Sequence, residues 1–287
     1  MYIFILIIKV ILTYLIYYIL KNICNDFKKE NFFSICNNKI TKKNIIEIDN
    51  IYDKNLKLKW IDYNNLFMKI NQPNNIIHDF EIKKDIINKA LKLKKNTCII
   101  DCGAHIGDGA IPIAQVLQNN DRNDIIIYAI DPSKDKCDFI EFIANENNLK
   151  NIKVLNYGLS DNNKLHYQNL PKDNNSGGSV WLLDKVNMAD NANNYNIKES
   201  LNFIKLDTLI SKKIIKEKLG IIHLDVEGME DSVIKGGIQN INKDKPYLTL
   251  EDNDNNKKEV MLNLLNNYKF VKRIYSNNIY EKIENNI

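Results

Sequence analysis

The feature that most constrains this chain is a regular alternation of short apolar runs and amphipathic segments between residues 97 and 252. The runs have the length of buried strands, and the segments between them have apolar residues at helical spacing. Alternating strands and helices form an α/β domain with a mostly parallel sheet and helices on both faces. The expected strands are 97–103, 124–132, 152–161, 221–228 and 246–252, and the expected helices are 107–118, 133–149, 207–218, 229–236 and 257–267.

Shorter patterns flank this alternating region. Residues 78–95 have apolar residues at helical spacing and end in lysines, which suit a helix C-terminus, so we expect the domain to begin there. At the other end, residues 270–276 and 279–283 predict a hairpin that turns at Asn277-Asn278. This hairpin would add an antiparallel strand at one edge of the sheet.

The charge of the chain gives no support for a nucleic-acid partner, and we expect none. It has 40 Lys and Arg against 36 Asp and Glu, which gives a net charge of +4. Only Arg122 and Arg273 are arginines, the residue type that makes two-pronged contacts to phosphate and guanine. The five cysteines have no paired spacing, so they predict free thiols in a reducing compartment rather than disulfides or a zinc site.

The first twenty residues are apolar except for Lys9 and Thr13, and as a helix they would match a ~30 Å hydrocarbon core. We expect a membrane anchor in residues 1–22; a helix docked on a protein surface and a cleaved signal peptide are the alternatives. Several lysines follow the segment, which favours a cytosolic catalytic domain. The expected domains are the anchor, an extension over residues 23–77 with short alternating strands at 45–52 and 56–63, and a catalytic domain over residues 78–287.

The first expected strand runs into a glycine-containing loop, Asp101-Cys102-Gly103-Ala104-His105-Ile106-Gly107-Asp108-Gly109. A dinucleotide-binding loop would have G-x-G-x-x-G here, so that main-chain amides receive a pyrophosphate. This loop has another glycine spacing and is preceded by an aspartate, which would repel a pyrophosphate and attract a cation. The second strand ends in Asp131, where an acid can hold both ribose hydroxyls. A ribose without an adjacent phosphate, joined to a positive charge, describes S-adenosylmethionine.

Several motifs in this order resemble those of the FkbM-type methyltransferases. The stretch IIDCGAHIGDGAI (99–111) is similar to the family's I-D-V-G-A-N-x-G, and LDVEGME (224–230) is similar to its I-D-V-E-G-x-E. This chain departs from the family pattern with His105 for Asn, Asp131 for Glu and Gly158 for Ala. Further matching stretches are Asp131-Pro132, Leu159-Ser160-Asp161, Leu206-Asp207-Thr208-Leu209, Val233-Ile234-Lys235-Gly236-Gly237 and Pro246 to Glu251.

The resemblance implies a class I, Rossmann-like methyltransferase that uses S-adenosylmethionine and usually acts on a hydroxyl oxygen. The expected acceptor is a hydroxyl on a sugar, a glycan or a small metabolite. Two alternatives are a nucleotide-sugar or NAD enzyme of similar fold, and a noncatalytic, membrane-anchored binding module.

Two groups of residues form the expected site. Asp225 and Glu227 lie two apart on the fourth expected strand, so their side chains should share a face at its carboxyl end. Asp225 would hold the cofactor amine or the substrate, and Glu227 would be the general base, unless the two acids only cap the next helix. Glu251 and Asp252 offer oxygen ligands for a divalent ion, but no metal site is assigned. The expected cofactor-binding residues are Asp101, Gly103, Ala104, His105, Gly107, Asp131 and Leu159.

The histidines give no metal or nucleophile pattern. His105 either lines the pocket or starts a helix, and His223, inside a buried strand, is expected to be a satisfied core histidine. His78 and His166 have no assigned role. Residues 174–179, which are rich in Asn, Gly and Ser, predict either a mobile pocket cover or an ordinary turn.

Overall fold

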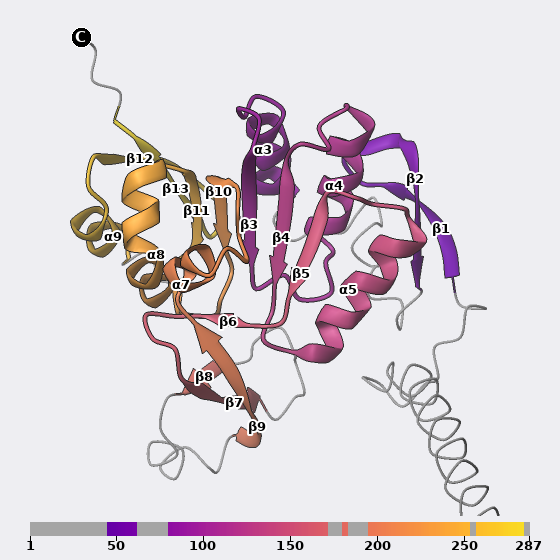
Figure 1. The fold of residues 1–287 in the computed structure, drawn as a ribbon. Coiled ribbons are helices and arrows are strands. Elements are labelled where there is room, and N and C mark those ends of the chain that lie inside the picture. Colours follow the sequence, from indigo (N-terminus) through magenta and orange to yellow (C-terminus); the bar gives the residue numbers. More distant parts are fainter. Residues whose placement is uncertain (1–44, 62–79, 172–179, 183–194, 253–256, 284–287) are drawn as a thin grey trace, which may run out of the picture. The chain divides into compact units, whose positions relative to one another are not determined.

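The computed structural model describes residues 45–61, 80–171, 180–182, 195–252 and 257–283 (Figure 1). The chain divides into two compact units, Met1–Ile46 and Glu47–Ile287. Of the first unit, only Ile45 and Ile46 are described, as the start of strand β1.

Seven strands form the central sheet, in the order β12-β13-β11-β10-β3-β4-β5. The five strands from β11 to β5 are parallel, whereas β13 runs antiparallel to both β11 and β12. A mostly parallel sheet with a C-terminal antiparallel hairpin is therefore confirmed. The strands are β3 (Thr97–Cys102), β4 (Ile126–Ile130), β5 (Ile152–Leu155), β10 (Lys218–Leu224), β11 (Tyr247–Glu251), β12 (Tyr268–Ile274) and β13 (Asn277–Lys282).

Two groups of helices cover the sheet, and alternate strand residues face one group or the other. Cys98, Ile100 and Cys102 of β3 lie in the core cluster that includes buried residues of α7, α8 and α9. Ile99 and Asp101 point to the opposite face, where they line a pocket with residues of α3 and α4. The helices are α3 (Phe80–Ala90), α4 (Ala110–Asn119), α5 (Lys134–Glu146), α7 (Leu206–Ser211), α8 (Glu230–Asp244) and α9 (Lys258–Leu264).

A second sheet is inserted between β5 and α7, and sequence analysis did not predict it as a sheet. Its strands are β6 (Gly158–Leu159), β7 (Leu165–Pro171), β8 (Val180–Leu182) and β9 (Tyr195–Ile204), in the order β6-β9-β7-β8. The single strand expected over residues 152–161 is wrong, because the chain leaves the central sheet at Leu155 and pairs β6 with β9 instead. Residues 174–179, the expected pocket cover, lie outside the described residues.

The expected short strands before the α/β domain are confirmed as β1 (Ile45–Asn50) and β2 (Asp53–Ile61), which pair with each other as a hairpin. Asn50 donates a hydrogen bond from Nδ2 to the Pro112 carbonyl oxygen of α4 at 3.0 Å, and Gln115 donates one from Nε2 to the Lys57 carbonyl oxygen at 2.7 Å. Trp60 is fully buried and meets the Phe139 ring edge-on. The hairpin therefore packs on the α/β domain.

Several element boundaries differ from the expected ones, and three of the differences have a clear physical reason. Helix α8 continues past Gly236 to Asp244. A Cβ at Gly236 would lie 1.9 Å from the Ser160 carbonyl oxygen, so this glycine allows close packing and does not end the helix. Helix α7 ends at Ser211, two residues before Lys213 adopts a positive φ of 58°. The C-terminal hairpin turns at Tyr275-Ser276, since Asn277 and Asn278 are buried and paired in β13.

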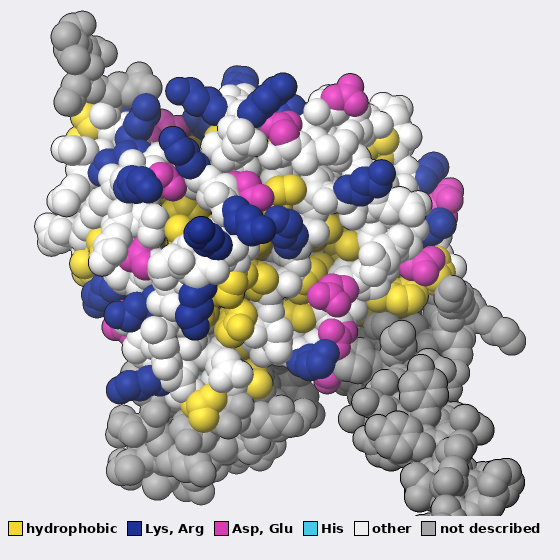
Figure 2. Space-filling model, viewed as in Figure 1, with side chains coloured by type: hydrophobic (Ala, Val, Ile, Leu, Met, Phe, Trp, Pro, Cys, Tyr) yellow, Lys and Arg dark blue, Asp and Glu magenta, His cyan; other side chains and the backbone are white. Residues whose placement is uncertain are grey.

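No helix in the described part of the chain is long and apolar enough to cross a membrane. Residues 1–20, on which the anchor prediction rests, lie outside that part. Figure 2 shows Lys and Arg side chains spread over one face of the molecule, with Asp and Glu side chains between them.

Candidate active site

The candidate site lies where β3, β4 and β10 end. The chain moves from β3 through β4 to β5 in one direction, and from β10 to β11 in the other, so β3 and β10 flank the point where the strand order reverses (Figure 1). Ligands of open α/β sheets bind outside the carboxyl ends of the strands at this point. Most of the site residues predicted from sequence lie at or just after the ends of these three strands.

The loop after β3 is held tightly against both neighbouring strands. The amides of Gly103 and Ala104 both donate to the Ile130 carbonyl oxygen, at 3.0 and 3.1 Å. Gly103 has φ +84°, and a Cβ on it would lie 1.8 Å from the main-chain oxygen of Asp225. Gly107 also has a positive φ, of 77°. A side chain at Gly103 would therefore push the β3 loop away from the β10 loop.

Asp131 joins the end of β4 to the β3 loop. Its side chain is buried, with Oδ2 accepting a hydrogen bond from the His105 amide at 3.0 Å and Oδ1 accepting one from the Ser133 amide at 2.9 Å. Lys136 brings its Nζ to 4.0 Å from Oδ2. Burial raises the pKa of Asp131, while Lys136 and the two amides oppose that rise. Each carboxylate oxygen has a second lone pair, with which it can accept a hydrogen bond from a ligand hydroxyl.

Burial shifts the pKa values of Asp101 and His105 in opposite directions. Burial raises the pKa of the Asp101 carboxyl to about 7 and lowers the pKa of the His105 imidazole to about 4, with Lys136 contributing to the second shift. His105 is therefore neutral near pH 7. It also has a positive φ of 50°, so it belongs to the loop rather than to the start of α4, which is at Ala110.

Asp225 lies beside the loop, but the expectation that Asp225 and Glu227 share one strand face is wrong. Strand β10 ends at Leu224, and Glu227 has a left-handed φ of 50°, which no strand residue adopts. The Asp225 amide still donates to the Cys102 carbonyl oxygen at 3.1 Å, which keeps Asp225 next to the β3 loop. Glu227 is exposed.

Glu230 explains the shape of this second loop, and sequence analysis gave it no role. Its carboxylate is 1% exposed and accepts hydrogen bonds from the amides of Val226 at 3.4 Å and Gly228 at 3.3 Å. Lys257 forms an ion pair with the same carboxylate. Glu230 thus fixes the main chain on both sides of Glu227. An acid in the first turn of a helix, just after a glycine, is the signal that could have indicated this.

The other acids and histidines near these strand ends have structural partners. Asp252 accepts hydrogen bonds from the Asn278 side chain and the Lys257 amide, and Glu251 accepts one from Ser276. No group of three or more His, Cys, Asp or Glu side chains among the described residues could hold a metal ion. His223 is confirmed as a core histidine, with Nδ1 2.8 Å from the Thr249 hydroxyl oxygen.

The structure brings the predicted cofactor residues together. Asp101, the 103–107 loop, Asp131 and Asp225 are linked by hydrogen bonds, close main-chain approach or mutual charge effects. Leu159 adjoins the start of the same loop, where its main chain hydrogen-bonds Cys102, and its side chain is buried in the apolar core cluster. His166 is buried and stacks on the Phe203 ring at 3.9 Å, whereas His78 lies outside the described residues.

A comparison with family profiles matches residues 101–272, more than half of the chain, to the family described as the methyltransferase FkbM domain. No curated protein matches the chain.

Three of the matching solved structures are also methyltransferases. Methyltransferase FkbM from Methylobacillus flagellatus has 17% identity and a TM-score of 0.44; the match covers 66% of this chain and 45% of that one, so this chain spans less than half of its length. A SAM-dependent methyltransferase from Aquifex aeolicus has 13% identity and a TM-score of 0.40 over 76% and 96% of the two chains. An rRNA methylase from Streptococcus thermophilus has 10% identity and a TM-score of 0.38 over 70% and 96%.

Proposed function

The chain belongs to the FkbM family of S-adenosylmethionine-dependent methyltransferases, with the class I fold, and from this we propose that it methylates a hydroxyl oxygen on a sugar, a glycan or a small metabolite. The observation that carries the proposal is the acidic edge at the switch point. Asp101, Asp131 and Asp225 surround a glycine loop there, at the ends of three neighbouring strands. Such an edge suits a cationic ligand with a free ribose.

The residues at this edge fit S-adenosylmethionine. Asp131 can accept hydrogen bonds from the ribose hydroxyls, since each of its oxygens holds only one of the two amide hydrogen bonds described above. Asp101 and Asp225 lie where they can attract the ammonium group of the amino-acid end. Gly103 lets the β3 loop approach the main chain of Asp225 closely, which brings Asp225 to the site. These residue roles are part of our proposal and go beyond the family assignment.

The same arrangement supports methyl transfer. When bound, S-adenosylmethionine supplies a methyl group activated by its sulfonium. Glu227 is the candidate general base: its carboxylate would take the proton of the acceptor hydroxyl as the oxygen bonds to the methyl carbon, while the methyl–sulfur bond breaks and S-adenosylhomocysteine leaves. Because methyl transfer from a sulfonium disperses charge, positioning of the two reactants should supply most of the acceleration. The exposure of Glu227 leaves it accessible to an acceptor from solution.

The two alternatives make different demands on the same edge. A nucleotide-sugar or NAD enzyme needs amides that receive a pyrophosphate, and the carboxylates of Asp101 and Asp108 beside this loop would repel one. A noncatalytic module would bind the cofactor without turnover. Incubating the full chain with methyl-labelled cofactor and fractionated lysate tests the acceptor class: label in a glycan or small-molecule fraction supports our proposal, and label in RNA or protein contradicts it.

Cofactor affinity provides a direct test at Asp131. Asp131→Ala should weaken S-adenosylmethionine binding by ~1.5–3 kcal/mol, because it removes hydrogen bonds to a charged acceptor. Isothermal calorimetry measures the change. Asp138→Ala is the matched control, since it removes a carboxylate from an exposed ion pair with Lys134 on α5. Heat with NAD and none with S-adenosylmethionine would contradict the assignment.

We also propose that residues 1–20 anchor the protein in a membrane, with the catalytic domain in the cytosol. Their length, apolar composition and following lysines support this. The cysteines Cys98, Cys102 and Cys137 are free and buried, which agrees with a reducing compartment.

Deleting residues 1–22 should release a soluble and active domain, because the first described strand begins more than twenty residues later. Carbonate extraction and protease protection of the full-length protein in cells measure this. Recovery of the full chain in the carbonate-soluble fraction would contradict spanning, and a protease-shielded domain would reverse the orientation.

A further inference from the structure

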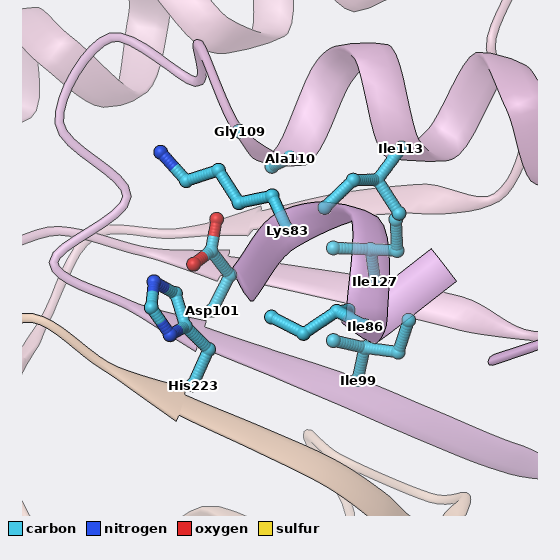
Figure 3. Close-up of a pocket in the computed structure, with 9 residues that line it drawn as sticks. All are labelled: Lys83, Ile86, Ile99, Asp101, Gly109, Ala110, Ile113, Ile127 and His223. Atoms are coloured by element: carbon cyan, nitrogen blue, oxygen red, sulfur yellow. The ribbon is translucent and has the colours of Figure 1, made fainter. Parts of the chain in front are cut away.

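Lys83 reaches the candidate site from α3, a helix that precedes the residues matched by the family. Its side chain is only 11% exposed and lines a pocket between α3, α4 and the sheet. Figure 3 shows Lys83, Asp101 and His223 together at one end of this pocket, and four isoleucines at the other. A lysine on the buried side of a helix is costly unless its ammonium group has partners.

The Lys83 ammonium lies over the start of α4. Its Nζ is 3.8 Å from Asp108 Oδ2, and a Cβ on Gly109 would lie 2.9 Å from Lys83 Cε and 3.2 Å from Nζ. A cation at a helix N-terminus opposes the helix dipole, and α4 has no acid in its own first turn. The attraction of the acids before α4 must therefore hold Lys83 there.

Lys83 also acts on the charge of Asp101. Among the charges that act on it, Lys83 is the one that lowers its pKa, whereas Asp108, Asp225 and Asp131 add to the rise caused by burial. The two histidines nearby do not replace that charge. His105 is neutral near pH 7, and His223 is buried against Thr249.

We propose that Lys83 is a positioning residue for the cofactor: its ammonium group, which pairs with Asp108 and lines the same pocket as Asp101, supports the Asp101 carboxylate so that it can bind the ammonium group of the amino-acid end of S-adenosylmethionine. The site holds four carboxylates, those of Asp101, Asp108, Asp131 and Asp225, against the two ammonium groups of Lys83 and Lys136. Its acidic groups therefore outnumber its lysines, which favours binding of a cationic ligand. The inference rests on the proposed function, since it concerns the same ligand.

Two ligands separate this role from a purely structural one. S-Adenosylhomocysteine carries the amino-acid end, whereas 5′-methylthioadenosine has the same ribose and adenine but no ammonium group. Calorimetry of both between pH 5.5 and 8.5 gives the dissociation constants. The ligand's own titration is common to all protein variants, so it cancels in the comparison between them.

Lys83→Met should raise the dissociation constant of S-adenosylhomocysteine about fivefold at pH 7 and about tenfold at pH 5.5, because loss of a neighbouring opposite charge raises a carboxyl pKa by ~1 unit and the pKa of Asp101 starts at about 7. The difference should shrink towards pH 8.5, where Asp101 ionises in both proteins. Binding of 5′-methylthioadenosine should be unchanged. Gly109→Ala should displace the Lys83 ammonium group without removing its charge. It should therefore shift the pH profile of S-adenosylhomocysteine binding in the same direction, but by less.

Lys84→Met is the matched control, since Lys84 is an exposed lysine of the same helix that lies over the Phe80 ring. It should leave both ligands unaffected. An equal loss of affinity for both ligands in Lys83→Met would make α3 a structural cover and overturn the proposal, as would an unchanged pH profile. Wild-type protein that binds neither ligand would instead overturn the proposed function.

Discussion

Replacing Glu227 by Gln should lower methyl transfer by about 10²–10⁴-fold and leave cofactor affinity nearly unchanged. The substitution keeps the size and hydrogen-bonding capacity of the side chain but removes the group that takes the proton. The amides of Val226 and Gly228, held by Glu230, keep the main chain around residue 227 in place in the variant. Turnover and calorimetry with the same preparation measure the two effects separately.

The backbone conformation of Glu227 allows a second test of the base assignment, with the variant Glu227→Gly. A non-glycine residue with a φ of 50° costs ~1–3 kcal/mol of strain, which a glycine at the same position would relieve. Glu227→Gly should therefore also lose turnover while its resistance to urea rises or stays the same. If Glu227 only stabilised the loop, both variants would lose stability. Glu141→Gln, on the exposed side of α5, is the matched control, and turnover of Glu227→Gln within threefold of wild type would contradict the base assignment.

The central sheet was predictable from sequence because its strands are buried on both faces. Runs such as residues 97–102 and 218–224 are nearly continuous apolar segments, and their order with the intervening helices determines a parallel sheet. The second sheet was not predictable in the same way. Strand β9 and its partners carry polar residues without a clean period, and only their pairing with each other identifies them as strands.

The positions of site residues at strand ends could be predicted from the sequence. Positions that depend on how a helix packs on the sheet could not. Asp101 lies near the end of β3 and Asp131 comes immediately after β4, so predicting the two strands also placed these two acids. The expected strand face for Glu227 failed because the apolar pattern gives no sign that the strand stops at Leu224. Helical spacing places Lys83 on the face of α3 that carries Ile86 and Ile87, and Lys84 off that face, so the burial of Lys83 was open to prediction. Its place in the pocket beside Asp101 depends on how α3 docks on the sheet.

Gly103→Ala should destabilise the domain by ~2–5 kcal/mol, a large part of the ~5–15 kcal/mol that holds a typical domain folded. Two costs add: a left-handed backbone for a residue with a Cβ, at ~1–2 kcal/mol, and overpacking against the Asp225 carbonyl oxygen, at ~1–3 kcal/mol. Because that oxygen belongs to the main chain, relief requires the β3 and β10 loops to separate, so cofactor affinity should fall as well. Urea unfolding and calorimetry measure the two losses.

Gly228→Ala separates these two costs within the same site. Gly228 has a φ of +97°, but a Cβ on it would meet nothing within 4 Å. The variant should therefore show only the backbone cost, and cofactor affinity should change little because no loop has to move. A stability loss in Gly228→Ala equal to that in Gly103→Ala would contradict the steric argument. A Gly103→Ala protein that unfolds less readily than wild type would contradict the close approach of the two loops, on which the placement of Asp225 beside the cofactor depends.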